Sequence, residues 1–232
     1  MSFFNPDEPV LKPKQGNLDI QDLEGLIRFR WHIKDWTLLS WLYTRIDQVF
    51  LLWGWITAVF FIVPQFFPTI SWSHHALAAS GVTSLGIVLM VKLTWFWGRV
   101  ESLCWVIYIW AMLMLAGMVL TDYGIWRGVS AILLNLCSIW LGLSGLGYLI
   151  TGIGLRSRTF IIASVMHGAA ITTLPLVARW QFLITGIVIA SCLFILAEVQ
   201  WDMRPPRLSP LLAPEQQQFN QEQHQKRRLS KA

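Results

Sequence analysis

The chain has 232 residues, of which 55% are hydrophobic and only 13% are charged, whereas charged residues make up about 25% of a typical soluble protein. This composition excludes a disordered chain, a collagen-like fibre and a disulfide scaffold, and it predicts an integral membrane protein in contact with the lipid bilayer. The net charge of +5 would suggest nucleic acid in a soluble protein, but in so apolar a chain we interpret the basic residues as topology signals and expect no nucleic-acid partner.

Residues 1–48 are expected to form a cytoplasmic arm. Residues 1–18 are polar and interrupted by prolines. Apolar residues then recur at helical spacing, at Ile20, Leu23, Ile27 and Trp31. Basic residues lie among and just after them, at Arg28, Arg30 and Lys34. This pattern predicts an amphipathic helix from Asp19 to Ile33 on the lipid surface, with a helix packed on a partner protein as the alternative. A second amphipathic stretch, 36–49, leads into the first span.

Six apolar segments follow this arm. Their expected limits are 49–67, 76–97, 103–121, 129–154, 159–175 and 180–199. A spanning helix needs about 20 apolar residues, which all but the fifth segment provide. None alternates polar and apolar residues as a membrane β-barrel strand would. We therefore expect an all-α bundle of about six transmembrane helices over 49–199, followed by a basic, glutamine-rich cytoplasmic tail over 200–232.

The basic residues predict the orientation of this bundle. If both termini are cytoplasmic, every Lys and Arg lies on the cytoplasmic side except Arg127 and Arg179. The opposite orientation would leave only those two inside. Because cytoplasmic loops carry an excess of Lys and Arg, the positive-inside rule favours a multi-pass protein with both ends in the cytoplasm.

Few ionisable residues lie within the apolar segments. Lys92 is a little over one turn from the cytoplasmic end of the second segment, where its stem can reach the headgroups. Carboxylates occur near segment ends, at Glu101, Asp122 and Glu198. A proton-coupled carrier needs a titratable relay near mid-membrane, and this pattern disfavours one.

One short motif suggests chemistry. Gly142-Leu143-Ser144-Gly145 has the GxSG form and resembles the serine motif of rhomboid intramembrane proteases, and Gly98-Arg99-Val100-Glu101 resembles a second rhomboid element. The resemblance implies a serine enzyme with Ser144 as nucleophile. A rhomboid carries its partner histidine in the sixth span, where this chain has none, so His167 in the fifth segment is the candidate base. The alternative is a packing serine and a histidine bonded to a backbone carbonyl.

His167 is also a candidate ligand for a haem or a pigment magnesium. His74 and His75 lie near the outer end of the second segment, at a different depth, so they do not form a facing pair with it. Trp105, Trp110 and Trp140 lie deep in their segments, either packed between helices or as ring walls for a bound ligand. The pattern names no cofactor and predicts no metal site, because it has neither a Cys/His cluster nor an HExxH motif.

These observations favour a membrane protein that acts by contact, as a partner or assembly factor of a larger membrane complex, and not as an enzyme. One alternative is a carrier of a neutral or lipid-like solute. The other is a rhomboid-like serine enzyme or a cofactor-binding membrane protein that uses Ser144 and His167.

Overall fold

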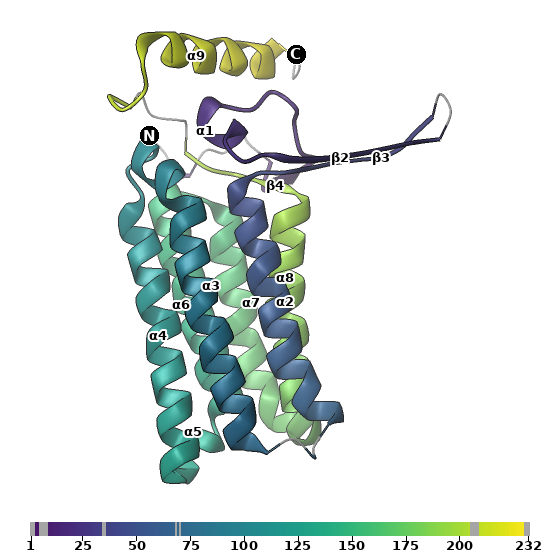
Figure 1. Cartoon of the computed structure of the whole chain (residues 1–232), viewed down its shortest axis with the longest axis vertical. Helices are drawn as coiled ribbons and strands as arrows, with labels where there is room; N and C mark the ends of the chain where they lie inside the picture. The colour runs from purple at the N-terminus through teal and green to yellow at the C-terminus, as the bar shows by residue number, and fades with distance from the viewer. Residues whose placement is uncertain are drawn as a thin grey trace.

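The computed structural model describes residues 3–4, 9–33, 36–67, 69, 71–204 and 209–229, without the side chains of 29–41 and 228–229. Five helical stretches in this part of the chain are long and apolar enough to cross a membrane. They are Arg45–Phe66, Trp72–Val100, Cys104–Arg127, Leu136–Leu155 and Arg158–Glu198. Figure 1 shows them side by side in one elongated bundle, in agreement with the expected integral membrane protein.

The first four stretches are single helices, namely α2 (Arg45–Phe66), α3 (Trp72–Val100), α4 (Cys104–Arg127) and α6 (Leu136–Leu155). The expected segment 129–154 is divided, because the short helix α5 (Ser130–Leu133) precedes α6. Helix α4 ends at Gly128, whose left-handed conformation, φ 63°, suits a residue without a side chain.

The fifth stretch consists of α7 (Arg158–Thr173), the 3-10 helix η1 (Leu174–Trp180) and α8 (Gln181–Glu198). Asp202, just after α8, accepts hydrogen bonds of 3.0 Å from the backbone amides of Arg158 and Thr159 at the start of α7. The end of α8 therefore lies beside the beginning of α7, and the chain reverses its direction in η1. This arrangement corresponds to the two expected segments 159–175 and 180–199.

Close backbone approach joins α6 to α7. A Cβ atom on Gly152 would lie 3.0 Å from the backbone nitrogen of Ile161, and one on Gly145 would lie 3.3 Å from the Cβ of His167. Small residues let membrane helices come together in this way. The GxSG stretch therefore lies where α6 packs on α7.

The expected amphipathic helix from Asp19 to Ile33 is wrong as secondary structure. Helix α1 covers only Ile20–Leu23, and Ile27–Ile33 forms strand β2, which pairs antiparallel with strand β3 (Trp36–Tyr43). Apolar residues at every second position of β2 are β-branched or aromatic, as strands prefer. The second stretch is also a strand up to Tyr43, after which α2 begins. Figure 1 shows this hairpin projecting sideways from the bundle.

Both ends of the chain cover the same end of the bundle. Strand β1 (Leu11–Lys12) pairs antiparallel with β4 (Gln200–Trp201), which follows α8. Helix α9 (Pro214–Leu229) then crosses above α1, as Figure 1 shows. We call this the α9 end. The bundle agrees with the expected all-α membrane fold, with five candidate spans where about six were expected, and two small two-stranded sheets accompany it.

Candidate functional site

Two adjoining cavities occupy the bundle and its α9 end. A polar cavity of about 420 Å³ lies among the N-terminal segment, α2, α3, β4 and α9. An apolar cavity of about 150 Å³ lies deeper, among the helices. Ile46, Trp97 and Trp201 line both of them, so the cavities share a wall. We call them the polar cavity and the aromatic cavity.

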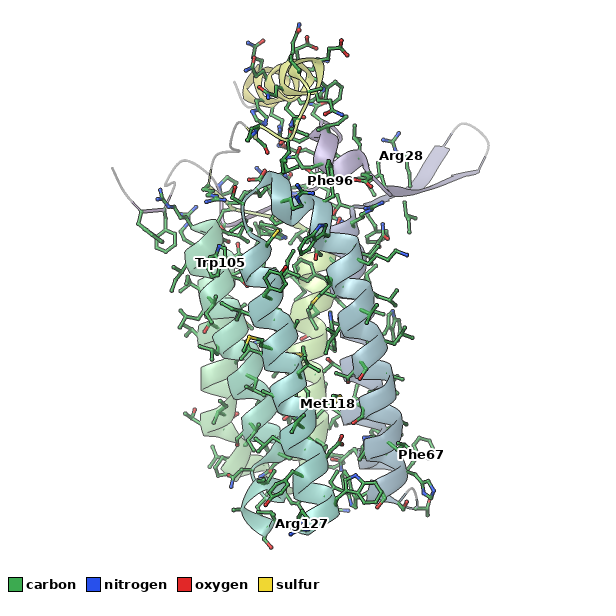
Figure 2. All side chains as sticks on the ribbon, turned by 60° about the vertical axis from the view of Figure 1, so that its left-hand side comes forward. Arg28, Phe67, Phe96, Trp105, Met118 and Arg127 are labelled. Atoms are coloured by element: carbon green, nitrogen blue, oxygen red, sulfur yellow. The ribbon has the colours of Figure 1, made fainter. Side chains whose placement is uncertain are left out.

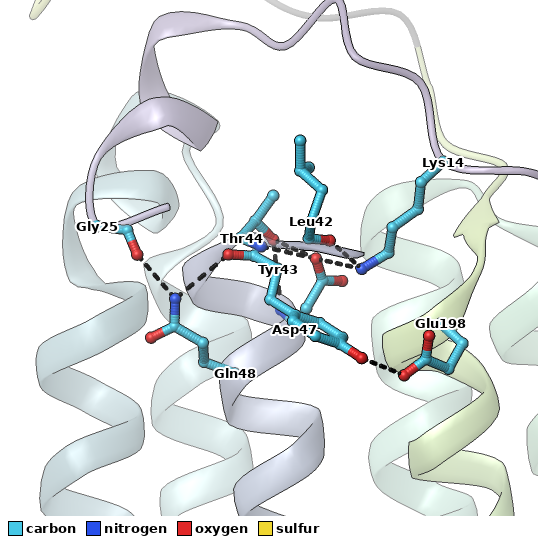
Figure 3. A network of polar contacts seen from close by, with 8 residues as sticks. All are labelled: Lys14, Gly25, Leu42, Tyr43, Thr44, Asp47, Gln48 and Glu198. Carbon is cyan, nitrogen blue, oxygen red and sulfur yellow. Dashed lines mark hydrogen bonds and ion pairs between the residues drawn. The ribbon is translucent and has the colours of Figure 1, made fainter. Parts of the chain in front are cut away.

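The start of α2 forms one side of the polar cavity. Thr44 and Asp47 form a capping box, in which the Thr44 backbone amide donates to Asp47 Oδ2 at 2.8 Å and the Asp47 amide donates to Thr44 Oγ1 at 3.3 Å. Lys14 Nζ lies 2.7 Å from Asp47 Oδ2 and donates to the Leu42 carbonyl at 2.8 Å. Figure 3 shows how this lysine ties the N-terminal segment to the helix start.

A second contact in Figure 3 joins β3 to α8. The Tyr43 hydroxyl donates to Glu198 Oε1 at 2.6 Å. Burial and this bond to a carboxylate raise the pKa of Tyr43 above its ordinary value of 10.0. The tyrosine therefore stays a neutral hydrogen-bond donor at physiological pH and holds the base of the hairpin against the bundle.

Helix α9 covers the polar cavity through contacts with α1. Asp19 pairs with Arg227 and lies 3.1 Å from His224 Nε2. Asn220 accepts a 2.8 Å hydrogen bond from the Ile20 amide and donates to Gln21 Oε1 at 3.1 Å. Residues about two hundred positions apart thus form this cover.

The polar cavity carries charges of both signs. Its basic residues are Lys12, Lys14, Arg204 and Arg227, together with His224. Its acidic residues are Asp19, Asp22, Asp47 and Glu101. Burial, followed by the nearby carboxylates of Asp19 and Glu101, raises the pKa of Asp22 to about 7. A polar group held here meets donors and acceptors, and Asp22 changes charge near neutral pH.

The aromatic cavity has almost entirely apolar walls. Nine aromatic side chains line it, namely Phe50, Trp53, Phe61, Trp97, Trp110, Trp140, Tyr148, Phe160 and Trp201. The indole N–H of Trp110 donates to Thr151 Oγ1 at 2.9 Å, and that of Trp140 donates to Thr121 Oγ1 at 3.1 Å. The indole nitrogen of Trp53 is buried with no hydrogen-bond partner in the described chain. This N–H group could donate a hydrogen bond to an acceptor on a bound molecule.

Two of the three deep tryptophans, Trp110 and Trp140, line this cavity and also pack against the hydrophobic core. The third, Trp105, is 44% exposed and is not part of this wall.

The structure places Ser144 and His167 close to the α6–α7 contact but does not join them. Ser144 is buried and lines the aromatic cavity. His167 is fully buried, and its Nδ1 donates to the Ala163 carbonyl at 2.8 Å. No hydrogen bond links Ser144 to His167 within the described residues. The bond from His167 to the Ala163 carbonyl is the kind of backbone contact expected for a histidine that only packs between helices.

His167 Nε2 is buried without a hydrogen-bond partner in the described chain, so this atom is what a haem or pigment metal would have to reach. His74 and His75 are bonded elsewhere, to Ser71 Oγ at 2.6 Å and to the Phe60 carbonyl at 3.1 Å. Across the described residues, no group of three or more His, Cys, Asp or Glu side chains could hold a metal ion.

Two of the three lipid-surface candidates, Arg28 and Arg30, lie on a strand and not on a helix. Arg28 is exposed, Arg30 lies on the same strand β2, and Lys34 lies outside the described residues. The sequence interpretation missed the residues of the polar cavity. Only the Thr44-x-x-Asp47 capping pattern was readable in advance, because the other contacts join distant parts of the chain.

Comparison with known proteins adds no assignment to this geometry. No protein-family model matches the chain, and no curated protein or solved structure matches it either.

Proposed function

We propose that this protein crosses the membrane six times, with both termini in the cytoplasm, and binds one lipid-like amphiphile in its two cavities. The observation that carries the proposal is the shared wall between an apolar aromatic cavity and a charged polar cavity. A molecule with an apolar end and a polar head matches that pair. This is the lipid-like solute of the sequence alternatives, and it requires no chemistry at Ser144.

The cavity size limits the apolar end of the ligand. A dry cavity of about 150 Å³ holds a molecule of the size of benzene, and the aromatic cavity has this volume. Its ring walls suit a flat ring or an unsaturated, isoprenoid-like end, since aromatic faces pack well on such groups. The Trp53 N–H suits a ligand that carries a hydrogen-bond acceptor at this end.

The distribution of basic residues supports the orientation. Arg127 lies at the far end of the bundle from α9 in Figure 2, and the Arg179 carbonyl accepts a bond from Gln65 near the end of α2. These are the two basic residues that the positive-inside rule leaves outside. The polar cavity then lies on the cytoplasmic side, beneath α9.

Mass spectrometry of the full chain in native-lipid nanodiscs tests the proposal. We expect one amphiphile enriched over the bulk lipid and bound at close to one molecule per chain. Ser144→Leu should displace it, because the larger side chain fills the cavity. Trp53→Phe keeps a ring but removes the donor and should weaken binding several-fold, as expected for one hydrogen bond.

Ser191→Leu is the matched control, because Ser191 lies exposed on α8 and does not line the aromatic cavity. Equal amphiphile content in the Ser144→Leu and Ser191→Leu proteins would contradict the proposal. A stoichiometric partner protein, recovered without any enriched amphiphile, would instead support contact with a larger membrane complex.

A further inference from the structure

The β2–β3 hairpin has one face of apolar and aromatic residues. Its register pairs Ile27 with Tyr43, Phe29 with Trp41, Trp31 with Leu39 and Ile33 with Trp36. Alternate residues of a strand lie on the same face, and directly paired residues share it. The other face takes Arg28, Arg30 and His32, which pair with Leu42, Ser40 and Thr37. The register shifts between Trp31 and His32, and on each side of this shift the pairing keeps the apolar residues opposite one another.

Two observations show which face is turned toward the bundle. Tyr43, which belongs to the apolar face, donates its hydroxyl to Glu198 in the last turn of α8. Arg28, which belongs to the basic face, is exposed, and Figure 2 shows its side chain on the side of the hairpin away from the helices. At the base of the hairpin, the apolar face is therefore turned toward the layer that the helices cross.

The hairpin also lies beside the end of a candidate membrane span, where a membrane surface would be. It runs directly into α2, whose apolar stretch begins at Arg45, and it extends sideways from the bundle (Figure 1). Two strands alone are marginally stable in water, so an apolar face of this length needs a surface to pack on. Headgroup water can satisfy the free backbone edges, which the hydrocarbon core could not.

We infer that this hairpin lies flat in the headgroup layer of the membrane that the helices cross, with its apolar face on lipid and its basic face toward the phosphates. Aromatic residues favour this layer, and arginine pairs well with phosphate oxygens. The inference concerns a surface separate from the two cavities, and it replaces the surface helix expected from the sequence.

Photo-crosslinking in the full-length protein tests this placement. The photoreactive residue p-benzoylphenylalanine is introduced in place of Trp31 on the apolar face or in place of Arg30 on the basic face. Irradiation of native membranes, followed by mass spectrometry, identifies the adducts. We expect lipid acyl-chain adducts at position 31 in at least several-fold excess over position 30. The pair Phe29 and Arg28 repeats the comparison if a first-pair variant fails to accumulate.

The adducts show whether lipid or a partner protein covers the apolar face. Lipid adducts at 31 or 29 but few at 30 or 28 support the inference. A protein adduct on the apolar face would assign the surface to a partner and overturn it. Equal yields on the two faces, or no lipid adduct at any of the four positions, would overturn it as well.

Discussion

Asp202 shows how one carboxylate completes the α9 end of the bundle. It is 3% exposed and accepts hydrogen bonds from the Ser157 and Thr159 hydroxyls at 2.8 and 2.7 Å. It also accepts from the first two amides of α7 and pairs with Arg158 Nε at 3.0 Å. Burial alone would raise the pKa of this group, but the hydrogen bonds from Arg158 and Thr159 hold it below 3.8. The ionised form is therefore the one that fits.

Asp202→Asn should destabilise the protein by about 2 kcal/mol at neutral pH, because an amide replaces a charged cap and an acceptor. The folded pKa lies below the unfolded value, so the contribution is complete above the unfolded pKa of about 3.9 and is lost as the pH falls through the folded pKa. Unfolding in detergent should give a constant difference between pH 5 and pH 8 that shrinks in stronger acid.

Glu215→Gln provides the control, since this carboxylate also lies at the start of a helix, in the first turn of α9, but is exposed. Its effect should stay within about 0.5 kcal/mol. An Asp202→Asn protein as stable as the Glu215→Gln protein would contradict the capping role.

At the scale of the helix, α6 is shaped by residues without side chains. A Cβ on Gly147 would lie 2.6 Å from the ring of Trp110. That ring is fixed, because its N–H donates to Thr151, whose hydroxyl donates in turn to the Gly147 carbonyl at 2.8 Å. The glycine therefore allows Trp110 to pack against the helix and to line the aromatic cavity.

Gly147→Ala should cost about 1–3 kcal/mol through overpacking, whereas Gly142→Ala should cost nothing, because a Cβ there would meet only Ile171 Cδ1 at 3.9 Å. Both substitutions lie in α6 and add one methyl group. Thermal unfolding of the two purified proteins in the same detergent compares them directly. Equal melting temperatures would show that Trp110 moves aside without loss.

The sequence predicted the helix limits well wherever one helix consists of one continuous apolar run. The limits of the helices follow because about 20 apolar residues satisfy their own backbone within a membrane. It was misleading at 27–33, where Ile27 and Trp31 fit a helical repeat and an alternating one equally. It was silent on the polar cavity, since the bond of Asn220 to Gln21 depends on how distant segments meet.

For the whole molecule, the separation of charge along the bundle predicts opposite compartments for its two ends. Reporter fusions at Gly124, near the end of α4, and at the C-terminus should report the outside and the cytoplasm respectively. A fusion after Ser157, between α6 and α7, should agree with the C-terminal one. The same compartment for Gly124 and the C-terminus would contradict the six-span arrangement.

The pairing of β1 with β4 also sets an order of events during synthesis. Leu11 and Lys12 leave the ribosome early, but their partners Trp201 and Gln200 follow only after every apolar helix has been made. The Asp19 contacts with His224 and Arg227 wait longer still. The N-terminal segment of a nascent chain can therefore meet Asp47 and Leu42 early through Lys14, but it meets its β4 and α9 partners last. The polar cavity gains its final walls only once α9 has been made.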